Sequence, residues 1–196
     1  MTALQLGHVL ELIDRANAAD PHTEIADGVE RPREWLYGQR MSTWLQRICP
    51  DASEHLKIAA RGQHIRRWEV PRDTYPASRE GYLQWRTYLY RFHADHLAEL
   101  MAAAGYGAAD IERVGYIVQK RGLKTDPEVQ TLEDVICLVF LEHHLAGFAA
   151  SQDPDKLVEI VRKTWSKMSE RGHDFALQLP FSDTIRPLLA KALGTA

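Results

Sequence analysis

The sequence predicts an all-α protein that folds as a single-domain helical bundle. Apolar side chains recur at helical spacing through most of the chain. Between these segments stand prolines, glycines and short polar residues of the kinds that begin and end helices. No segment combines alternating apolar and polar residues with an enrichment in β-branched residues. We therefore expect no strands.

The composition is that of a water-soluble globular protein. With 196 residues, 45% of them hydrophobic and 26% charged, the chain is long enough to form a core without disulfides or a structural metal. We expect one domain over residues 1–196, in which residues 33–180 form the core and the terminal helices pack on it. The net charge of −3 gives no general basic field for nucleic acid or for an anionic membrane.

Three features of the sequence predict a cytoplasmic protein. Cys49 and Cys137 form no redox or zinc motif, which indicates a reducing compartment. The N-terminal stretch contains Glu11 and Asp14 and no basic leader, so it does not resemble a secretory signal. The longest apolar run, VICLVFL from Val135 to Leu141, is far shorter than the ~20 residues that a membrane span needs.

Three helices are predicted in the first third of the chain. The first has its apolar face at Leu6, Val9, Leu10 and Ile13. The polar stretch 18–32 is predicted to be a loop. The second helix has its apolar face at Tyr37, Met41, Trp44, Leu45 and Ile48 and ends at Pro50. Asp51 and Glu54 resemble a capping box, and the third helix is expected to continue to about Glu69.

The remaining helices follow from caps and breaks. Ser78 is predicted to cap a long helix to about Ala104, with an inward stripe at Tyr82, Leu89, His93, His96, Leu100 and Ala103. A helix over 108–121 is expected to end at Gly122. Asp126-Pro127 opens an almost wholly apolar helix to about residue 150, which we expect to be central. Further helices are predicted from Asp153-Pro154 to Met168, over 170–179 and over 181–193.

The stretch from Ala59 to Arg86 is dense in arginine and aromatic residues and predicts an anion-binding wall. Arg61, His64 and Arg67 are spaced by three, which places them on one face of the predicted helix. Arginine donates paired hydrogen bonds to phosphate or carboxylate groups. The other residues expected to bind substrate or anion are Arg72, Arg86, Lys120 and Lys124. A solvated basic face is the alternative.

A second set of residues could hold a divalent metal. His93 and His96 lie three apart on the long helix, so two imidazoles could approach one ion. Asp134 lies on the most apolar helix, where a carboxylate is costly unless it is paired or bound to a cation. We predict His64, His93, Asp134 and His96 as metal ligands, and Asp134 and Glu133 as catalytic residues. A carbonyl-bonded histidine and a structural partner for Asp134 stay open.

Several sequence runs resemble the family catalogued as domain of unknown function 4202. These runs are ARGQHIRRWEVPRDTYPASREGYLQWR, RFHADH, GLKTDPEVQTLEDVICLVFLEHH and KTWSKMSERGH. The resemblance extends from the segment YGQRMSTWL, which begins at Tyr37, to His173. It implies membership of that family and brings no activity with it.

More distantly, the order His64, His93, Asp134 is similar to that of the HD superfamily of metal-dependent phosphohydrolases. That resemblance implies an HD-type helical bundle, in which a bound metal activates water to attack a phosphate ester. The HD pattern has an aspartate directly after its second histidine. Here that position is Ala94, and Asp95 or His96 would have to take its place.

Two functions are therefore expected, and whether the protein is an enzyme is left open between them. The first is a metal-dependent phosphohydrolase acting on a small phosphorylated molecule or nucleotide. The second is a non-catalytic module that binds an anion or nucleotide, or a partner protein through its aromatic residues. The sequence predicts no membrane or nucleic-acid partner, and it does not indicate the oligomeric state.

Overall fold

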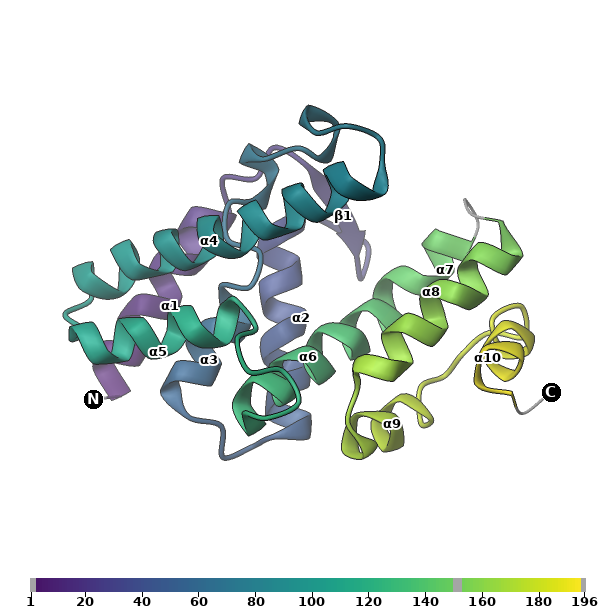
Figure 1. The fold of residues 1–196 in the computed structure, drawn as a ribbon. Coiled ribbons are helices and arrows are strands. Elements are labelled where there is room, and N and C mark those ends of the chain that lie inside the picture. The colour runs from purple at the N-terminus through teal and green to yellow at the C-terminus, as the bar shows by residue number, and fades with distance from the viewer. Residues whose placement is uncertain (1–2, 150–152, 195–196) are drawn as a thin grey trace.

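The computed structural model describes residues 3–149 and 153–194, and it confirms a mostly helical protein (Figure 1). The elements of the N-terminal half are α1 (Ala3–Asn17), β1 (Thr23–Ala26), β2 (Val29–Pro32), α2 (Arg33–Ile48), α3 (Glu54–Arg61) and α4 (Arg79–Ala103). Those of the C-terminal half are α5 (Ala108–Val118), α6 (Pro127–Val139), α7 (Leu145–Ala149), α8 (Pro154–Lys167), α9 (Glu170–Ala176) and α10 (Arg186–Leu193). The predicted end of one helix at residue 150 lies outside the described residues.

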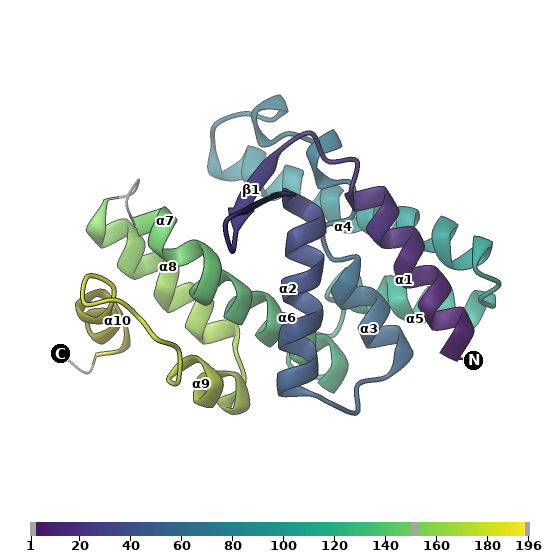
Figure 2. The ribbon, with the colours of Figure 1, turned by 180° about the vertical axis from the view of Figure 1, so that it is seen from behind.

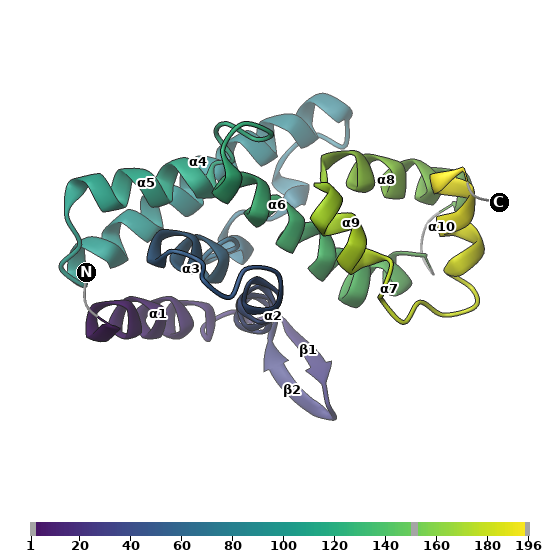
Figure 3. The same cartoon turned by 90° about the horizontal axis from the view of Figure 1, so that it is seen from below.

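The helix α6 crosses the middle of the molecule, as its apolar sequence predicts (Figures 1 and 2). It contacts α2, α3 and α5 on one side and α8 and α9 on the other. Figure 3 shows this division from below, with α1, α3, α4 and α5 to one side and α7 to α10 to the other. One cluster of buried side chains extends through both groups, from Val9 to Ala192. Burial of this apolar surface is the main source of stability.

The polar stretch 18–32 contains a β-hairpin, so the predictions of a loop and of a strand-free fold are wrong here. β1 and β2 pair antiparallel, with Ala26 opposite Val29. Asp27 and Gly28 between them have φ of 51° and 74°, and a tight type I′ turn needs positive φ at both positions. The Asp-Gly pair was the available signal. The flanking strands are only four residues long and mostly exposed, so they lack an apolar pattern.

The third helix ends at Arg61 rather than near Glu69. Gly62 terminates it, and a Cβ at Gly62 would lie 2.3 Å from Leu97 Cδ2, so the chain passes too close to α4 for a side chain there. The chain then turns through Arg66, at φ 52°, into a short 3-10 turn over Arg67–Glu69. Arg61, His64 and Arg67 therefore do not share a helix face. The cap of α3 is also not Asp51 but Ser53, which accepts from Leu56 N at 3.1 Å.

Helix α4 begins at the predicted cap, where Ser78 accepts from Gly81 N at 3.1 Å. Its buried stripe differs from the predicted one: it follows every fourth residue, at Trp85, Leu89, His93, Leu97 and Met101. Tyr82, expected to face inward, is 42% exposed. The prediction failed because it used an average spacing near 3.5 residues, whereas the buried positions recur every four residues.

The other caps are mostly as predicted. Asp126 caps α6 and Asp153 caps α8, each followed by proline in the first turn. Helix α5 ends at Val118, three residues before the predicted Arg121, and Lys120 takes a left-handed conformation with φ 59°. The long apolar helix is interrupted by a π-helical turn over Phe140–His144 before α7. Such turns often accompany functional sites.

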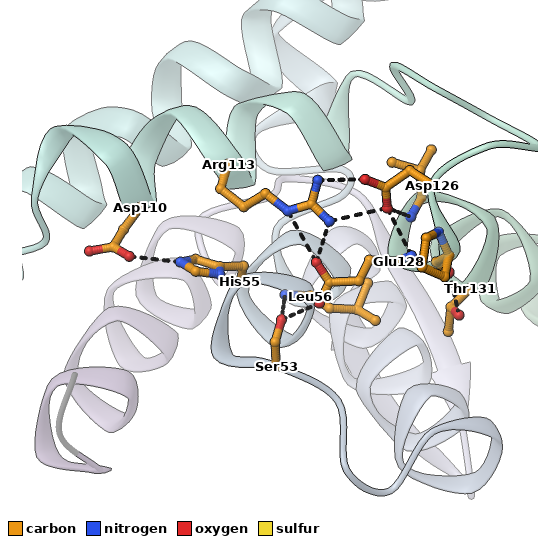
Figure 4. A network of polar contacts seen from close by, with 10 residues as sticks. Ser53, His55, Leu56, Asp110, Arg113, Asp126, Glu128 and Thr131 are labelled. Carbon is orange, nitrogen blue, oxygen red and sulfur yellow. Dashed lines mark hydrogen bonds and ion pairs between the residues drawn. The ribbon is translucent and has the colours of Figure 1, made fainter.

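A polar network joins the starts of α3 and α6 to α5 (Figure 4). The Arg113 guanidinium on α5 donates to both oxygens of Asp126, at 2.7 and 3.1 Å, and also to Glu128. The Ser53 hydroxyl donates to the same Glu128 carboxylate. Beside this network, His55 and Asp110 are 2.8 Å apart. One arginine thus stabilises two helix starts at once.

We predict that Arg113→Met lowers the free energy of unfolding by about 1–2 kcal/mol, because both carboxylates lose a charged partner. Chemical denaturation measures this. Arg121→Met, at an exposed position where the side chain bonds only to Gln119 among the contacts described, is the control and is expected to change stability little. Equal effects of both substitutions would show that the network does not stabilise the fold.

Candidate functional site

Charged and aromatic side chains from many elements converge around His64. They are Glu34 and Tyr37 from α2, His64 and Arg67 from the turn after α3, Arg86, Tyr90 and His93 from α4, Lys120 after α5, Glu133 from α6 and Lys167 at the end of α8. We call this set the His64 cluster. No other part of the described structure gathers so many charged groups from separate elements.

The His64 ring is held from two directions. Its Nδ1 lies 3.1 Å from Glu34 Oε2, and its face stacks on Tyr37 with ring centres 3.9 Å apart and planes 9° apart. The side chain keeps 23% of its surface exposed. Because Nδ1 faces Glu34, Nε2 is the ring nitrogen left to meet a ligand. The geometry thus fixes the orientation of the imidazole without closing it off from solvent.

Burial and the positive charge around His64 keep its imidazole neutral. Burial, followed by the charges of Arg67 and Lys120, lowers the pKa of His64 well below its usual value. Glu34 shows the opposite effect: burial raises its pKa to about 7, although Arg67 opposes this. With a pKa of about 7, the Glu34 carboxyl is only about half ionised at neutral pH, so the pair carries less than a full negative charge.

The cations of the cluster are held in place by aromatic rings and by one carboxylate. The Arg67 guanidinium lies 5.0 Å from the centre of the Trp85 ring. Arg86 donates to the Tyr90 hydroxyl at 2.5 Å, and Lys120 Nζ lies 5.8 Å from the centre of the Tyr90 ring. These aromatic contacts orient the cations without neutralising them, and Arg67 also lies 3.8 Å from Glu34 Oε1.

Glu133 is the carboxylate that pairs with the lysines. Its side chain is 3% exposed, and its oxygens lie 2.6 Å from Lys120 Nζ and 3.7 Å from Lys167 Nζ. Burial alone would raise the pKa of Glu133, but Lys120, Lys167 and Arg86 outweigh it and hold the pKa below the usual value. Glu133 is therefore ionised. The four cations Arg67, Arg86, Lys120 and Lys167 still outnumber the carboxylates, so the cluster carries excess positive charge.

Two of the predicted metal ligands, His64 and His93, lie together with ring centres 6.0 Å apart, but the predicted carboxylate ligand, Asp134, does not join them. Both oxygens of Asp134 are engaged at the start of α9: Oδ1 accepts from Ser169 N at 2.8 Å, and Oδ2 accepts from Ser169 Oγ at 2.5 Å. Gln130 also donates to Oδ1, at 3.0 Å. Asp134 therefore has the structural partner that the sequence left open, and it anchors α9 rather than joining the His64 cluster.

His93 and His96 each have a structural contact of their own. His93 is buried and its Nδ1 bonds to the carbonyl of Ile65 at 2.9 Å, while burial and then the neighbouring His64 lower its pKa to about 3. His96 lies 3.5 Å from Glu99 and meets the edge of the Phe92 ring. Within residues 3–149 and 153–194, no three or more His, Cys, Asp or Glu side chains are arranged to hold a metal ion.

Three of the predicted anion-binding residues have structural contacts instead. Arg61 lies beside Asp14, at 3.6 Å. Arg72 donates to the carbonyls of Tyr75, Pro76 and Ser78 and so shapes the loop before α4. Lys124 donates to the carbonyls of Lys167 and Met168 at the end of α8. Arg67, Arg86 and Lys120, by contrast, lie in the His64 cluster.

Sequence reasoning missed Glu34, Tyr37 and Lys167. Glu34 reads as an ordinary acidic residue in the first turn of α2, and Tyr37 as one of its apolar contacts. Lys167 reads as a basic residue in the last turn of α8. Their place in the cluster depends on contacts between helices far apart in sequence, so no local signal could have revealed it.

Comparison with known proteins assigns the chain to a family without assigning an activity. Residues 7–189 match the family described as Domain of unknown function (DUF4202). The match is wider than the predicted core of 33–180. No curated protein and no solved structure matches the chain, so the resemblance to the HD superfamily gains no support. In the described part of the chain, no helix has both the length and the apolar character to cross a membrane.

Glu34 should make stability depend on pH. Its folded pKa of about 7 lies above its unfolded value of 4.5, so the folded state holds a proton that the unfolded state has released. The stability that Glu34 contributes is therefore lost as the pH rises from about 5 to 8. We predict that, over that interval, the free energy of unfolding of Glu34→Gln rises relative to that of the wild type by on the order of 3 kcal/mol.

Denaturant unfolding at several pH values tests this prediction. Glu112→Gln, at an exposed position on α5, is the control and should run parallel to the wild type. If the free energies of unfolding of Glu34→Gln and the wild type differ by the same amount at every pH, the raised pKa of Glu34 is contradicted.

Proposed function

The chain belongs to the DUF4202 family, and we propose that it binds a small phosphorylated molecule through the His64 cluster. The observation that supports this most is the charge imbalance of the cluster. Four cations surround one neutral imidazole, and the only firmly ionised carboxylate among them is Glu133. Uncompensated charge in a partly buried site is costly, and a bound anion would offset that cost.

The kinds of cation present favour a phosphoryl group. Arg67 and Arg86 can each donate two parallel hydrogen bonds, which match the oxygens of a phosphate. Lys120 and Lys167, which both pair with Glu133, add compact ammonium charges. The chain as a whole is negative, at −3, so the attraction is local and suits a small anion better than a long nucleic acid.

A metal-dependent phosphohydrolase is the other function expected from the sequence. In its favour, the rings of His64 and His93 lie 6.0 Å apart, and His93 Nε2 is free of the carbonyl bond made by Nδ1. Against it, the carboxylate expected to complete the site, Asp134, is engaged with Ser169. We propose that ligand binding needs no metal. Chelation by EDTA should leave the affinity for pyrophosphate unchanged. If EDTA abolishes pyrophosphate binding, the metal-dependent function is favoured instead.

Calorimetric titration with pyrophosphate tests the proposed function. Arg67→Gln is expected to weaken binding at least about tenfold, because a charge-assisted hydrogen bond contributes roughly 1.5–3 kcal/mol. Arg66→Gln is a matched control one residue away, where the side chain pairs with Glu69 and is 43% exposed. It should bind pyrophosphate as the wild type does.

Circular dichroism establishes that both variants are folded before they are titrated. If the folded wild type shows no pyrophosphate binding, or if Arg66→Gln and Arg67→Gln weaken it equally, the His64 cluster is not the anion site.

A further inference from the structure

We propose that the ligand of the His64 cluster is a nucleotide, whose base stacks on Tyr82 while its phosphate binds the cations. This inference rests on the proposed function and adds the class of ligand. It concerns a residue that the phosphate site does not need: an exposed aromatic ring placed beside the cluster. A phosphate site alone explains the arginines and lysines, but it gives no reason for such a ring.

A continuous series of contacts connects Tyr82 to the cations. The Arg86 guanidinium lies 5.7 Å from the centre of the Tyr82 ring and 5.6 Å from the centre of the Tyr90 ring. Lys120 Nζ lies 5.8 Å from the same Tyr90 ring and 2.6 Å from Glu133. Arg86 therefore stands between Tyr82 on one side and the lysine part of the cluster on the other.

The spacing along α4 fits a base and a phosphate joined by a sugar. Tyr82, Arg86 and Tyr90 are four residues apart, so they lie on one face of the helix. Four residues correspond to a rise of about 6 Å. A ribose can bridge such a separation, with the base over Tyr82 and the phosphate at Arg86. Arg67 lies over the Trp85 ring, whose centre is 6.0 Å from that of the Tyr82 ring, so a second arginine is near the proposed nucleotide.

The Tyr82 ring is open to a stacking partner. It is 42% exposed, although the helical pattern predicts it to face inward. Its recorded neighbours are the Trp85 ring, with centres 6.0 Å apart and planes tilted by 43°, and the guanidinium groups of Arg86 and Arg72, which lie over the ring at 5.7 and 6.0 Å. None of them is a close parallel stack. Because 42% of Tyr82 remains exposed, a base could stack on the uncovered part of the ring, next to these guanidinium groups.

Other exposed aromatic residues do not share this position. Tyr88 is 49% exposed, but its ring lies near those of Tyr75 and Phe92, at 6.5 and 6.1 Å. It is six residues after Tyr82, which places it on a different face of α4. Tyr88 is thus a matched control of the same residue type, on the same helix and with similar exposure.

The experiment compares the four common nucleoside 5′-monophosphates with ribose 5-phosphate, which shares their phosphate and sugar but has no base. Stacking of a base on an aromatic residue contributes roughly 1–3 kcal/mol, so the best nucleotide should bind about 5- to 150-fold more tightly than ribose 5-phosphate. Tyr82→Ala should remove most of that difference and leave the affinity for ribose 5-phosphate unchanged. Tyr82→Phe and Tyr88→Ala should retain the preference for the nucleotide over ribose 5-phosphate.

The outcomes separate this inference from the function on which it rests. If the wild type binds pyrophosphate but prefers no nucleotide over ribose 5-phosphate, or if Tyr82→Ala weakens both ligands equally, the nucleotide assignment is overturned and the anion site stands. If the wild type does not bind pyrophosphate, both are overturned. Because Tyr82 is exposed, Tyr82→Ala is expected to fold, and circular dichroism verifies this.

Discussion

The buried contacts of Glu133 with Lys120 and Lys167 are the interactions on which the rest of the site depends. Glu133 lies on α6, the helix that both halves of the protein share. Its two lysine partners come from the loop after α5 and from the end of α8. A carboxylate that is 3% exposed is tolerated only because both lysines reach it. In satisfying it, they bring positive charge from two distant elements to one place.

The neighbouring carboxylate, Asp134, shows how position around a helix separates two roles. Successive residues of a helix point in directions about 100° apart. Glu133 consequently faces the lysines, and Asp134 faces the start of α9, where it accepts from Ser169. In the sequence, Glu133 and Asp134 look alike, because both are carboxylates on the same apolar helix. Only the contacts with the loop after α5, with α8 and with α9 distinguish the charged centre of a site from a structural anchor.

Local signals predict most of the helices, and long-range contacts decide the rest. Ser78, Asp126 and Asp153 are caps whose hydrogen bonds lie within three residues, so the sequence alone is enough to place them. The third helix was predicted too long because the close approach of Gly62 to Leu97 is invisible in sequence. The same limit applies to the site. Arg67 and Arg72 look alike as residues, yet one lies near Glu34 and the other bonds to loop carbonyls.

An NMR titration of the His64 imidazole tests most directly whether the surrounding cations make an anion site. Its ring proton resonances are followed against pH, with and without pyrophosphate. Burial, together with the surrounding positive charge, predicts that His64 in the free protein titrates well below its usual pKa, and the charge of a bound anion should raise this pKa. A His64 that titrates near 6.5 in the free protein and does not respond to pyrophosphate would contradict the central claim.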